Sequence, residues 1–235
     1  MTPVKALLFM LAMLVAGRAM AARPLLEVRC ERAVSNPAVV ISTQQNGYSV
    51  DNTRSYRSLT ALKGNAPANA YVLGLTRAES RMLISSAGPL LTDVFSGYEC
   101  IAPKVTVQLN YAPITIFVGS EFAPGTCAYQ QILAHEMRHL KTYLDYLPKV
   151  GGVVRGAMAD RFENKPLYAK KGQAQAVLQR EIDTSWMPWM KREMVKVEAQ
   201  QAMIDTPGEY GRLSRVCKGE VQSIIGPAIG TRRTK

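Results

Sequence analysis

The chain places its two histidines four residues apart, with a glutamate directly after the first. His135 and His139 are the only histidines among 235 residues, and both lie in the stretch ILAHEMRHLK. On a helix, residues i and i+4 project from the same face, so both imidazoles can bind one metal ion. Glu136 then stands beside the metal, where its carboxylate can take a proton from a bound water. This H-E-x-x-H pattern predicts a zinc site with Glu136 as the catalytic base.

The same letters would also describe an ordinary pair of helical histidines with a surface carboxylate between them. The pattern has three fixed positions, and a chain with so few histidines matches it by accident more rarely than an average chain does. We therefore favour the metal site. Zinc suits two imidazoles and a carboxylate, although other divalent ions accept the same ligands.

A third metal ligand has to be an oxygen donor, because no histidine is left. Glu181 is the preferred candidate, since it falls within the apolar stripe of a later helical segment, where a carboxylate needs a partner to be tolerated. The ordinary alternative is a partly exposed Glu181 that pairs with Arg180 or Lys191.

Asp145 is the second candidate for this third ligand. It follows His139 by six residues, which is the spacing of the third ligand in metzincins. However, Thr142 stands where those proteins have the glycine that turns the chain, so a continued helix would carry Asp145 away from the metal. Three further carboxylates remain open: Asp183, Glu163 and Asp160.

Residues 1–21 have the form of a signal peptide. Lys5 precedes the apolar run ALLFMLAMLVAG, and Ala19-Met20-Ala21 provides a small-x-small cleavage site. The alternative is an uncleaved anchor, but the run is short for a membrane span. We expect export to the periplasm or beyond, with residues 22–235 forming a single domain, two small domains being the alternative.

Four cysteines in an exported chain predict two disulfides. The spacing contains no C-x-x-C, so a cysteine zinc site is not expected. Sequence does not choose among the three connectivities. We favour Cys100 with Cys127, which closes a moderate loop ahead of the histidines, and Cys30 with Cys217, which ties the ends together.

The chain is strongly basic, with a formal net charge of +11. Loss of Lys5 and Arg18 with the signal peptide would lower this to about +9. The cations are spread along the sequence, which favours a solvated basic surface over a dedicated polyanion site. An anionic envelope polymer is a candidate partner beside the substrate. We expect neither nucleic-acid binding nor stable membrane insertion after cleavage.

Strand patterns fill the first half of the chain. Short apolar runs between residues 25 and 47 predict strands, as does the run 71–75. Thr76 and Glu79 have the spacing of a capping box and predict a short helix that ends at Gly88-Pro89. The alternating residues 105–118, interrupted by the sequence NYAP, predict a β-hairpin.

Helical patterns fill the second half. One helix is expected from Cys127 to Leu147, ended by Pro148 and followed by a flexible Gly151-Gly152. A second helical region is expected from about 167 to 204, bent near Pro188. Strands followed by long helices predict an α+β fold in which a small, mostly antiparallel sheet packs on the histidine helix.

The segment 70–147 resembles a group of bacterial exported proteins known as secreted zinc-dependent proteases of unassigned function. The likeness rests on the sequence YVLGLT from Tyr71, on Gly88-Pro89, on a cysteine ahead of the alternating segment, and on Cys127 followed by ILAHEMRHL. It implies a zincin-like metallopeptidase with His135 and His139 as zinc ligands and Glu136 as the base. It supplies neither a substrate nor a third ligand, and the C-terminal helical region has no counterpart in it.

The leading functional hypothesis is an exported zinc-dependent endopeptidase that binds extended peptides along a strand near the active helix. One alternative is a non-catalytic basic envelope protein with a structural or vestigial metal site. The other is a metal-dependent amidase that acts on cell-wall peptides.

Overall fold

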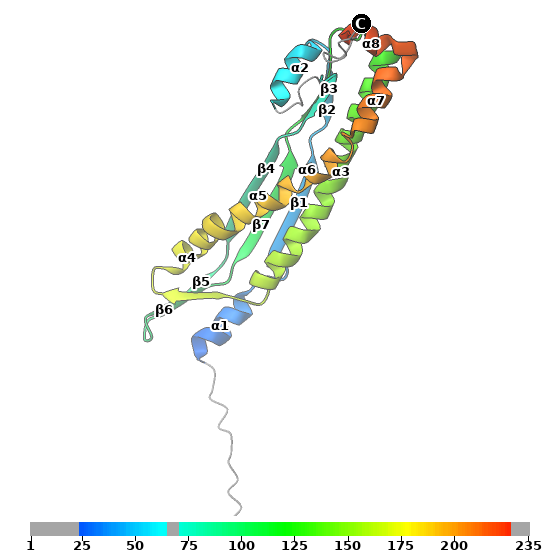
Figure 1. The fold of residues 1–235 in the computed structure, drawn as a ribbon. Helices are drawn as coiled ribbons and strands as arrows, with labels where there is room; N and C mark the ends of the chain where they lie inside the picture. Colours follow the sequence, from blue (N-terminus) through cyan, green and yellow to red (C-terminus); the bar gives the residue numbers. More distant parts are fainter. Residues whose placement is uncertain (1–23, 65–70, 227–235) are drawn as a thin grey trace, which may run out of the picture.

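A computed structural model describes residues 24–64 and 71–226, and in it the protein is an elongated α+β structure (Figure 1). A long helix, α3 (Cys127–Phe162), runs along a narrow sheet, and a chain of shorter helices crosses beside it. The main hydrophobic core lies between α3, the sheet and these shorter helices. The fold class expected from the sequence is confirmed, with a mixed rather than mostly antiparallel main sheet.

The main sheet is built from three long segments that each break once. In order across the sheet, the lower half is β1-β7-β4 and the upper half is β2-β8-β3. The central pair runs parallel to one neighbour and antiparallel to the other. The strands are β1 (Val39–Gln45), β2 (Tyr48–Asp51), β3 (Gly74–Arg77), β4 (Ser80–Ala87), β7 (Lys104–Tyr111) and β8 (Ile114–Val118).

The three breaks lie side by side across the sheet. At one break Ala112 and Pro113 separate β7 from β8, and the Ala112 amide donates to the Glu79 carbonyl at 2.9 Å. The Asn46 side chain donates to the Tyr111 carbonyl at 2.6 Å. The predicted hairpin over residues 105–118 is therefore wrong. Both halves continue in one direction, because Pro113, which has no amide hydrogen, interrupts the ladder without turning the chain.

The predicted helix after Thr76 is also wrong, because residues 74–87 form β3 and β4. The alternation of half-buried and exposed side chains favours a strand over a helix here. Along β4 the half-buried side chains Met82, Ile84 and Ser86 alternate with exposed ones, which is the period of a strand packed on one face. Hydrogen bonding of β4 to β7 stabilises the strand more than the capping-box pattern of Thr76 and Glu79 stabilises a helix.

A second small sheet lies at one end of the molecule. It has the order β5-β6-β9 and joins the β5–β6 hairpin to a strand from the distant C-terminal half. Helix α1 (Leu25–Ala33) packs against it, so the strand expected at residue 25 is a helix. The three strands are β5 (Leu90–Asp93), β6 (Tyr98–Ile101) and β9 (Leu167–Lys170).

Helix α3 is longer than the sequence indicated. Thr126 caps its start by accepting a hydrogen bond from the Tyr129 amide at 3.2 Å. Pro148 does not end the helix, since it lies on the exposed side where a freed carbonyl can be hydrated. Gly151 and Gly152 are helical too, and Gly151 is buried against β1, where a Cβ would lie 2.8 Å from Thr43 Cγ2.

The second helical region begins after β9 and consists of several short helices. The buried Glu99 carboxylate accepts from the Ala174 amide at 2.8 Å and thereby anchors the start of α4. A π-helical turn precedes Pro188, in agreement with the bend expected there. The elements are α4 (Ala174–Glu181), η1 (Ile182–Trp186), α5 (Met187–Val195) and α6 (Val197–Ala202).

Both expected disulfides are present, but with different partners. Cys30 bonds to Cys100, and Cys127 bonds to Cys217. The favoured pairing was wrong because α1 packs on β6 at one end of the molecule, whereas the C-terminal helices return to the start of α3 at the other. The helices not yet named are α2 (Tyr56–Lys63), α7 (Pro207–Arg215), η2 (Cys217–Gly219) and α8 (Glu220–Ile225).

The predicted signal peptide and the basic tail at residues 232–235 lie outside the described residues. Within the described part, no helix has the length and apolar character needed to cross a membrane. The two disulfides indicate that the chain folds in an oxidising compartment outside the cytoplasm.

The neighbouring glycines of α3 give a test of its packing on β1. Gly152→Ala meets open space and should raise the free energy of unfolding by about 0.5–1 kcal/mol, because alanine favours a helix. Gly151→Ala should show no such gain, because its methyl group must displace Thr43. Urea unfolding of both variants measures the difference. Equal gains would mean that α3 does not pack on β1 this closely.

Candidate metal centre

Helix α3 directs both histidines into one buried place. The exposed fractions of His135 and His139 are 4% and 8%. Their Nε2 atoms lie 3.2 Å apart. The four-residue spacing thus brings two ring nitrogens together, as the pattern predicted.

A third group, Asp205, reaches the same point from the C-terminal region. Its Oδ1 atom lies 3.2 Å from Nε2 of His135 and 3.2 Å from Nε2 of His139. Asp205 stands in the link between α6 and α7, directly before Thr206, whose hydroxyl caps α7 by accepting from the Glu209 amide. The start of α7 therefore fixes the backbone that carries this carboxylate.

The three atoms match the coordination requirements of zinc. Their mutual distances are all 3.2 Å. Ligands at the corners of a tetrahedron with metal–ligand bonds of about 2.0 Å are separated by about 3.3 Å. Two imidazoles and one carboxylate leave a fourth corner free, which is the ligand count of catalytic zinc sites. The group could hold a metal ion.

The hydrogen bonds around His139 determine its tautomer. The Gln201 side-chain NH₂ group donates to the His139 carbonyl at 3.2 Å, which orients the amide. Gln201 Oε1 then faces His139 Nδ1 at 2.6 Å and must accept a hydrogen bond from an Nδ1–H group. In the neutral imidazole the proton is on Nδ1, so Nε2 presents a lone pair toward Asp205.

His135 is oriented in the same way by a carboxylate. Its Nδ1 lies 3.2 Å from Glu209 Oε1. The same nitrogen lies 2.7 Å from Arg138 Nη2, which also bonds to Glu209. When Nδ1 carries the proton it donates to Glu209, and when it does not it accepts from Arg138. The first of these two tautomers is the one that metal binding requires, because it leaves the Nε2 lone pair of His135 free for a metal.

Glu209 is held as an anion by its neighbours. Arg212 donates to both carboxylate oxygens, at 3.0 and 2.8 Å, and with His135 and Arg138 it lowers the pKa of Glu209 to about 2, against the opposing effect of burial. Arg212 also donates to Gln131 on α3 at 2.9 Å. The carboxylate that orients His135 is thus tied to α3 itself.

Lys63 from α2 completes the surroundings of Asp205. Its Nζ atom lies 2.7 Å from Asp205 Oδ2, the oxygen that does not face the histidines. Burial raises the pKa of Asp205, but hydrogen bonds from His135, His139 and Lys63 outweigh it and lower that pKa well below its usual range. Asp205 therefore remains ionised, with one oxygen bound to Lys63 and the other available to a cation.

The central observation is that three acceptor atoms converge. In the tautomers with the proton on both Nδ1 atoms, two imidazole lone pairs and one carboxylate oxygen face each other at 3.2 Å, an arrangement that a cation among them stabilises. A proton on Nε2 of His139 can provide part of this stabilisation by donating to Asp205. Although burial lowers the pKa of His139, its hydrogen bond to Asp205 and the nearby Glu136 charge raise it above its ordinary value. A divalent ion neutralises all three acceptors.

Glu136 lies beside this group and is buried as well, with 4% exposed. The Thr76 hydroxyl donates to its Oε2 at 2.8 Å. Burial raises the pKa of Glu136, and the nearby histidines offset this only in part. Gly74 of β3 lies against the same carboxylate, because a Cβ there would come within 2.8 Å of Glu136 Oε1. Strand β3 thus holds Glu136 from one side.

The group opens into a cavity of about 130 Å³ between β3, α3 and the C-terminal helices. Its walls combine apolar side chains with the candidate metal ligands and with the Tyr210 hydroxyl, which lies 3.5 Å from Lys63 Nζ. The lining residues are Lys63, Val72, Leu73, Gly74, Leu75, Thr76, Ile132, His135, Glu136, His139, Tyr143, Glu198, Gln201, Asp205, Tyr210 and Leu213.

The structure replaces Glu181 with Asp205 as the candidate third ligand. Glu181 accepts two hydrogen bonds from Arg161, at 2.8 and 2.7 Å, and one from Trp186. Arg161 lies 22 residues beyond His139 on the same helix, which is about 33 Å along its axis. The carboxylate in the apolar stripe does have a partner, but that partner is an arginine.

The other open candidates do not approach the histidines either. Asp145 pairs with Lys141 on the surface of α3. Asp183 accepts from Gln179 at 2.9 Å. Asp160 lies in the last turn of α3 and Glu163 directly follows it as the C-cap, both far from His139.

Sequence reasoning missed Asp205 and Glu209. The signal available was Thr206-Pro207 with Glu209 three residues after Thr206, which combines a cap, a proline at the first helical position and a capping box. This pattern predicts the start of a helix directly after Asp205. Nothing in it indicates that this helix returns to His139, 66 residues earlier.

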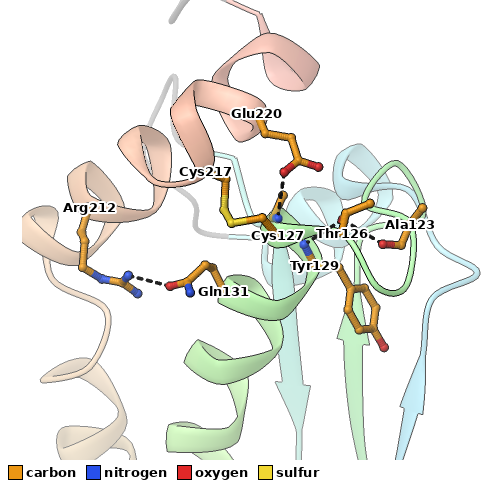
Figure 2. The surroundings of a disulfide bond; sticks show 9 residues. Ala123, Thr126, Cys127, Tyr129, Gln131, Arg212, Cys217 and Glu220 are labelled. Carbon is orange, nitrogen blue, oxygen red and sulfur yellow. Dashed lines mark hydrogen bonds between the residues drawn. A yellow bond between two sulfur atoms is a disulfide. The ribbon is translucent and has the colours of Figure 1, made fainter.

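The second cluster of potential ligands, Cys127, Cys217 and Glu220, is not a metal site, because its sulfurs form the disulfide. Figure 2 shows this bond at the start of α3, where Glu220 Oε2 accepts from the Ala128 amide at 3.0 Å. The disulfide and this cap hold the segment with Asp205 and Glu209 against α3.

No protein family, curated protein or solved structure matches the chain.

Single substitutions test which residues bind the metal. Asp205→Asn should lower zinc affinity by more than about a hundredfold, because it removes the charged donor, and His139→Ala should do the same. Glu181→Gln is the matched control and should keep wild-type affinity. Zinc content by elemental analysis, with competition against a chromogenic chelator, measures each value. Zinc loss in Glu181→Gln with retention in Asp205→Asn would restore the sequence-based assignment.

The Cys127–Cys217 disulfide gives a further test of how the centre is held together. Cys127 is exposed and Cys217 half-buried, whereas Cys30 and Cys100 are fully buried, so mild reductant should open the first bond selectively. Opening it frees the segment with Asp205, and zinc affinity should fall by about tenfold. Thiol labelling with mass spectrometry identifies the open bond. Unchanged affinity in the opened protein would show that the helical contacts alone hold the segment.

Proposed function

We propose that the protein is an exported zinc-dependent peptidase that hydrolyses peptide bonds. The observation that carries this proposal is the buried Glu136 carboxylate beside the convergent His135, His139 and Asp205 acceptors. A zinc ion bound there would supply Lewis acidity toward water and toward a substrate carbonyl. The arrangement also supports placing the chain with the bacterial exported H-E-x-x-H proteins that it resembles.

Glu136 is assigned the role of general base. It is within the cavity, and its hydrogen bond from Thr76 engages Oε2, which leaves Oε1 to accept a proton from water. Its raised pKa makes it a stronger base than an exposed carboxylate, and the surrounding burial keeps it from being solvated. The same carboxylate can then return the proton to the leaving amine.

Two donors face the cavity from the side of Asp205. The Tyr210 hydroxyl and the Lys63 ammonium group both line it. Either can donate to the oxygen on which negative charge develops when a peptide carbonyl is attacked. Lys63 bonds to Asp205, and the Tyr210 hydroxyl contacts both Lys63 and Asp205, so either donor would exchange a contact with Asp205 for one with the substrate oxygen.

The substrate is expected to bind along β3. This strand is the outer strand of the upper sheet half, and its residues Gly74, Leu75 and Thr76 line the cavity. An extended peptide can add to such an edge through backbone hydrogen bonds, which gives recognition of main chain with little dependence on sequence. The strand expected for this role was in the supposed hairpin; β3 replaces it.

Replacement of the base separates chemistry from metal binding. Glu136→Gln should reduce hydrolysis of an unfolded protein such as reduced casein by about 10²–10⁴-fold, while zinc content stays unchanged. Glu79→Gln, an exposed glutamate on the link between β3 and β4, is the matched control and should keep full activity. Product formation by mass spectrometry provides the readout.

Three outcomes of this experiment would contradict the proposal in different ways. Full activity of Glu136→Gln would remove Glu136 from the mechanism. A zinc-loaded wild-type protein that cleaves neither casein nor cell-wall peptides would indicate a structural metal site. Cleavage of cell-wall peptides alone would indicate the amidase.

A further inference from the structure

The turn between β5 and β6 lies at the end of the molecule away from α7 and α8 (Figure 1). It presents two apolar side chains to solvent. Val94 is 70% exposed and Phe95 is 97% exposed. Leu90 and Tyr98, on the strands directly behind the turn, are each about half exposed. We call Leu90, Val94, Phe95 and Tyr98 the hairpin tip.

The exposure of Phe95 is imposed by an ordered turn. The Phe95 amide donates to the Asp93 carboxylate at 3.0 Å, and the Gly97 amide donates to the Asp93 carbonyl at 3.2 Å. Gly97 has a φ of 74°, which glycine adopts without strain. These bonds fix the backbone so that Phe95 cannot fold back onto the sheet, although exposing a phenylalanine costs free energy.

Cations surround the base of the hairpin tip. Lys170 of β9 lies directly opposite Tyr98 in the sheet, and the Lys171 amide donates to the Gly97 carbonyl at 3.0 Å. Hydrogen bonds from Ser96 and Phe95 lower the pKa of the Asp93 carboxyl, and the nearby Arg29 of α1 contributes to a smaller extent. All three cations are exposed. Asp93 keeps its negative charge, but the three cations outnumber it.

The order of chemical groups along this end matches a membrane interface. Phe95 and Val94 stand at the apex, Tyr98 is behind them, and Lys170, Lys171 and Arg29 form a collar. Apolar side chains that reach the acyl boundary, with an aromatic hydroxyl and cations at headgroup level, are typical of peripheral membrane binding. Anionic lipids attract such cations, and the whole chain carries a net charge of +11.

The position of the N-terminal apolar run provides independent support. Residues 6–17 form this run, and α1 begins a few residues later at Leu25. Helix α1 packs on β5 and β6 through Leu26, Cys30 and the Cys30–Cys100 disulfide. Only residues 18–24 separate the run from α1, so a bilayer that held the run would lie nearer to the hairpin end than to the candidate metal centre. We propose that the hairpin tip is a peripheral docking site for membranes that contain anionic lipid.

The first experiment compares vesicle binding of matched variants. The processed protein is sedimented with vesicles of equal parts phosphatidylglycerol and phosphatidylcholine, and with vesicles of phosphatidylcholine alone. Val94→Ser/Phe95→Ser should weaken binding to the anionic vesicles by at least about tenfold. Leu83→Ser/Val153→Ser removes two exposed apolar residues elsewhere on the surface and should leave binding unchanged.

A second pair of variants tests the cationic collar. Lys170→Gln/Lys171→Gln should weaken binding to anionic vesicles by about fivefold per lysine, in a salt-sensitive manner. Lys149→Gln/Lys191→Gln removes the same charge from exposed positions outside the collar and should have a much smaller effect. Circular dichroism and zinc content confirm that each variant is folded.

A spectroscopic readout locates the tip in the bilayer. Phe95→Trp should show a blue-shifted emission with anionic vesicles and quenching by lipids brominated on the acyl chain. Absence of binding by the wild-type protein would overturn the proposal. A protein partner would then be the remaining candidate for the hairpin tip. Equal loss in the tip and control variants would overturn it as well, as would binding that depends on charge alone, which would indicate adsorption to any anionic polymer.

Discussion

The convergence of three hydrogen-bond acceptors at a buried point is the constraint around which this protein is organised. Two imidazole nitrogens and one carboxylate oxygen at mutual distances of 3.2 Å would separate if their backbones were free. Each is therefore held from behind by a partner of fixed chemistry: Gln201 for His139, Glu209 for His135 and Lys63 for Asp205. Such support orients metal ligands before a metal binds.

That support comes from segments that are remote in sequence. Lys63 lies on α2, the histidines on α3, and Gln201, Asp205 and Glu209 on α6, on the following link and on α7. Covalent and charged contacts return the last segment to α3: the Cys127–Cys217 disulfide, the Glu220 cap and the Arg212–Gln131 hydrogen bond (Figure 2). All three act within the first turns of α3, one to two turns before His135. The start of this helix is consequently the place where the centre is assembled.

The features that depend on local spacing could be predicted from the sequence. Those that depend on contacts between segments distant in the sequence could not. The histidine pair and the helix that carries it follow from a four-residue period, and the π-helical bend follows from Pro188. Asp205 could not be selected, because its approach to His139 depends on how five short helices pack. Glu181 was attractive since a carboxylate in an apolar stripe needs a partner, but the rule does not distinguish a metal from Arg161. The hairpin failed for a similar reason: NYAP interrupts a strand, and only neighbouring strands decide whether the chain turns there.

The length of α3 separates two surfaces with different chemistry. The helix has 36 residues, and the step from His139 to Phe162 at its end is about 35 Å. The candidate metal centre lies near its beginning, whereas its end leads through β9 to the sheet that carries the hairpin tip. Gly151 lets α3 lie close against β1, and Glu99 anchors α4 beside the small sheet, so the two ends are joined by packed elements. A membrane bound at the hairpin tip would leave the cavity open to substrates away from the bilayer surface. The distance between the two surfaces is therefore set by one continuous helix.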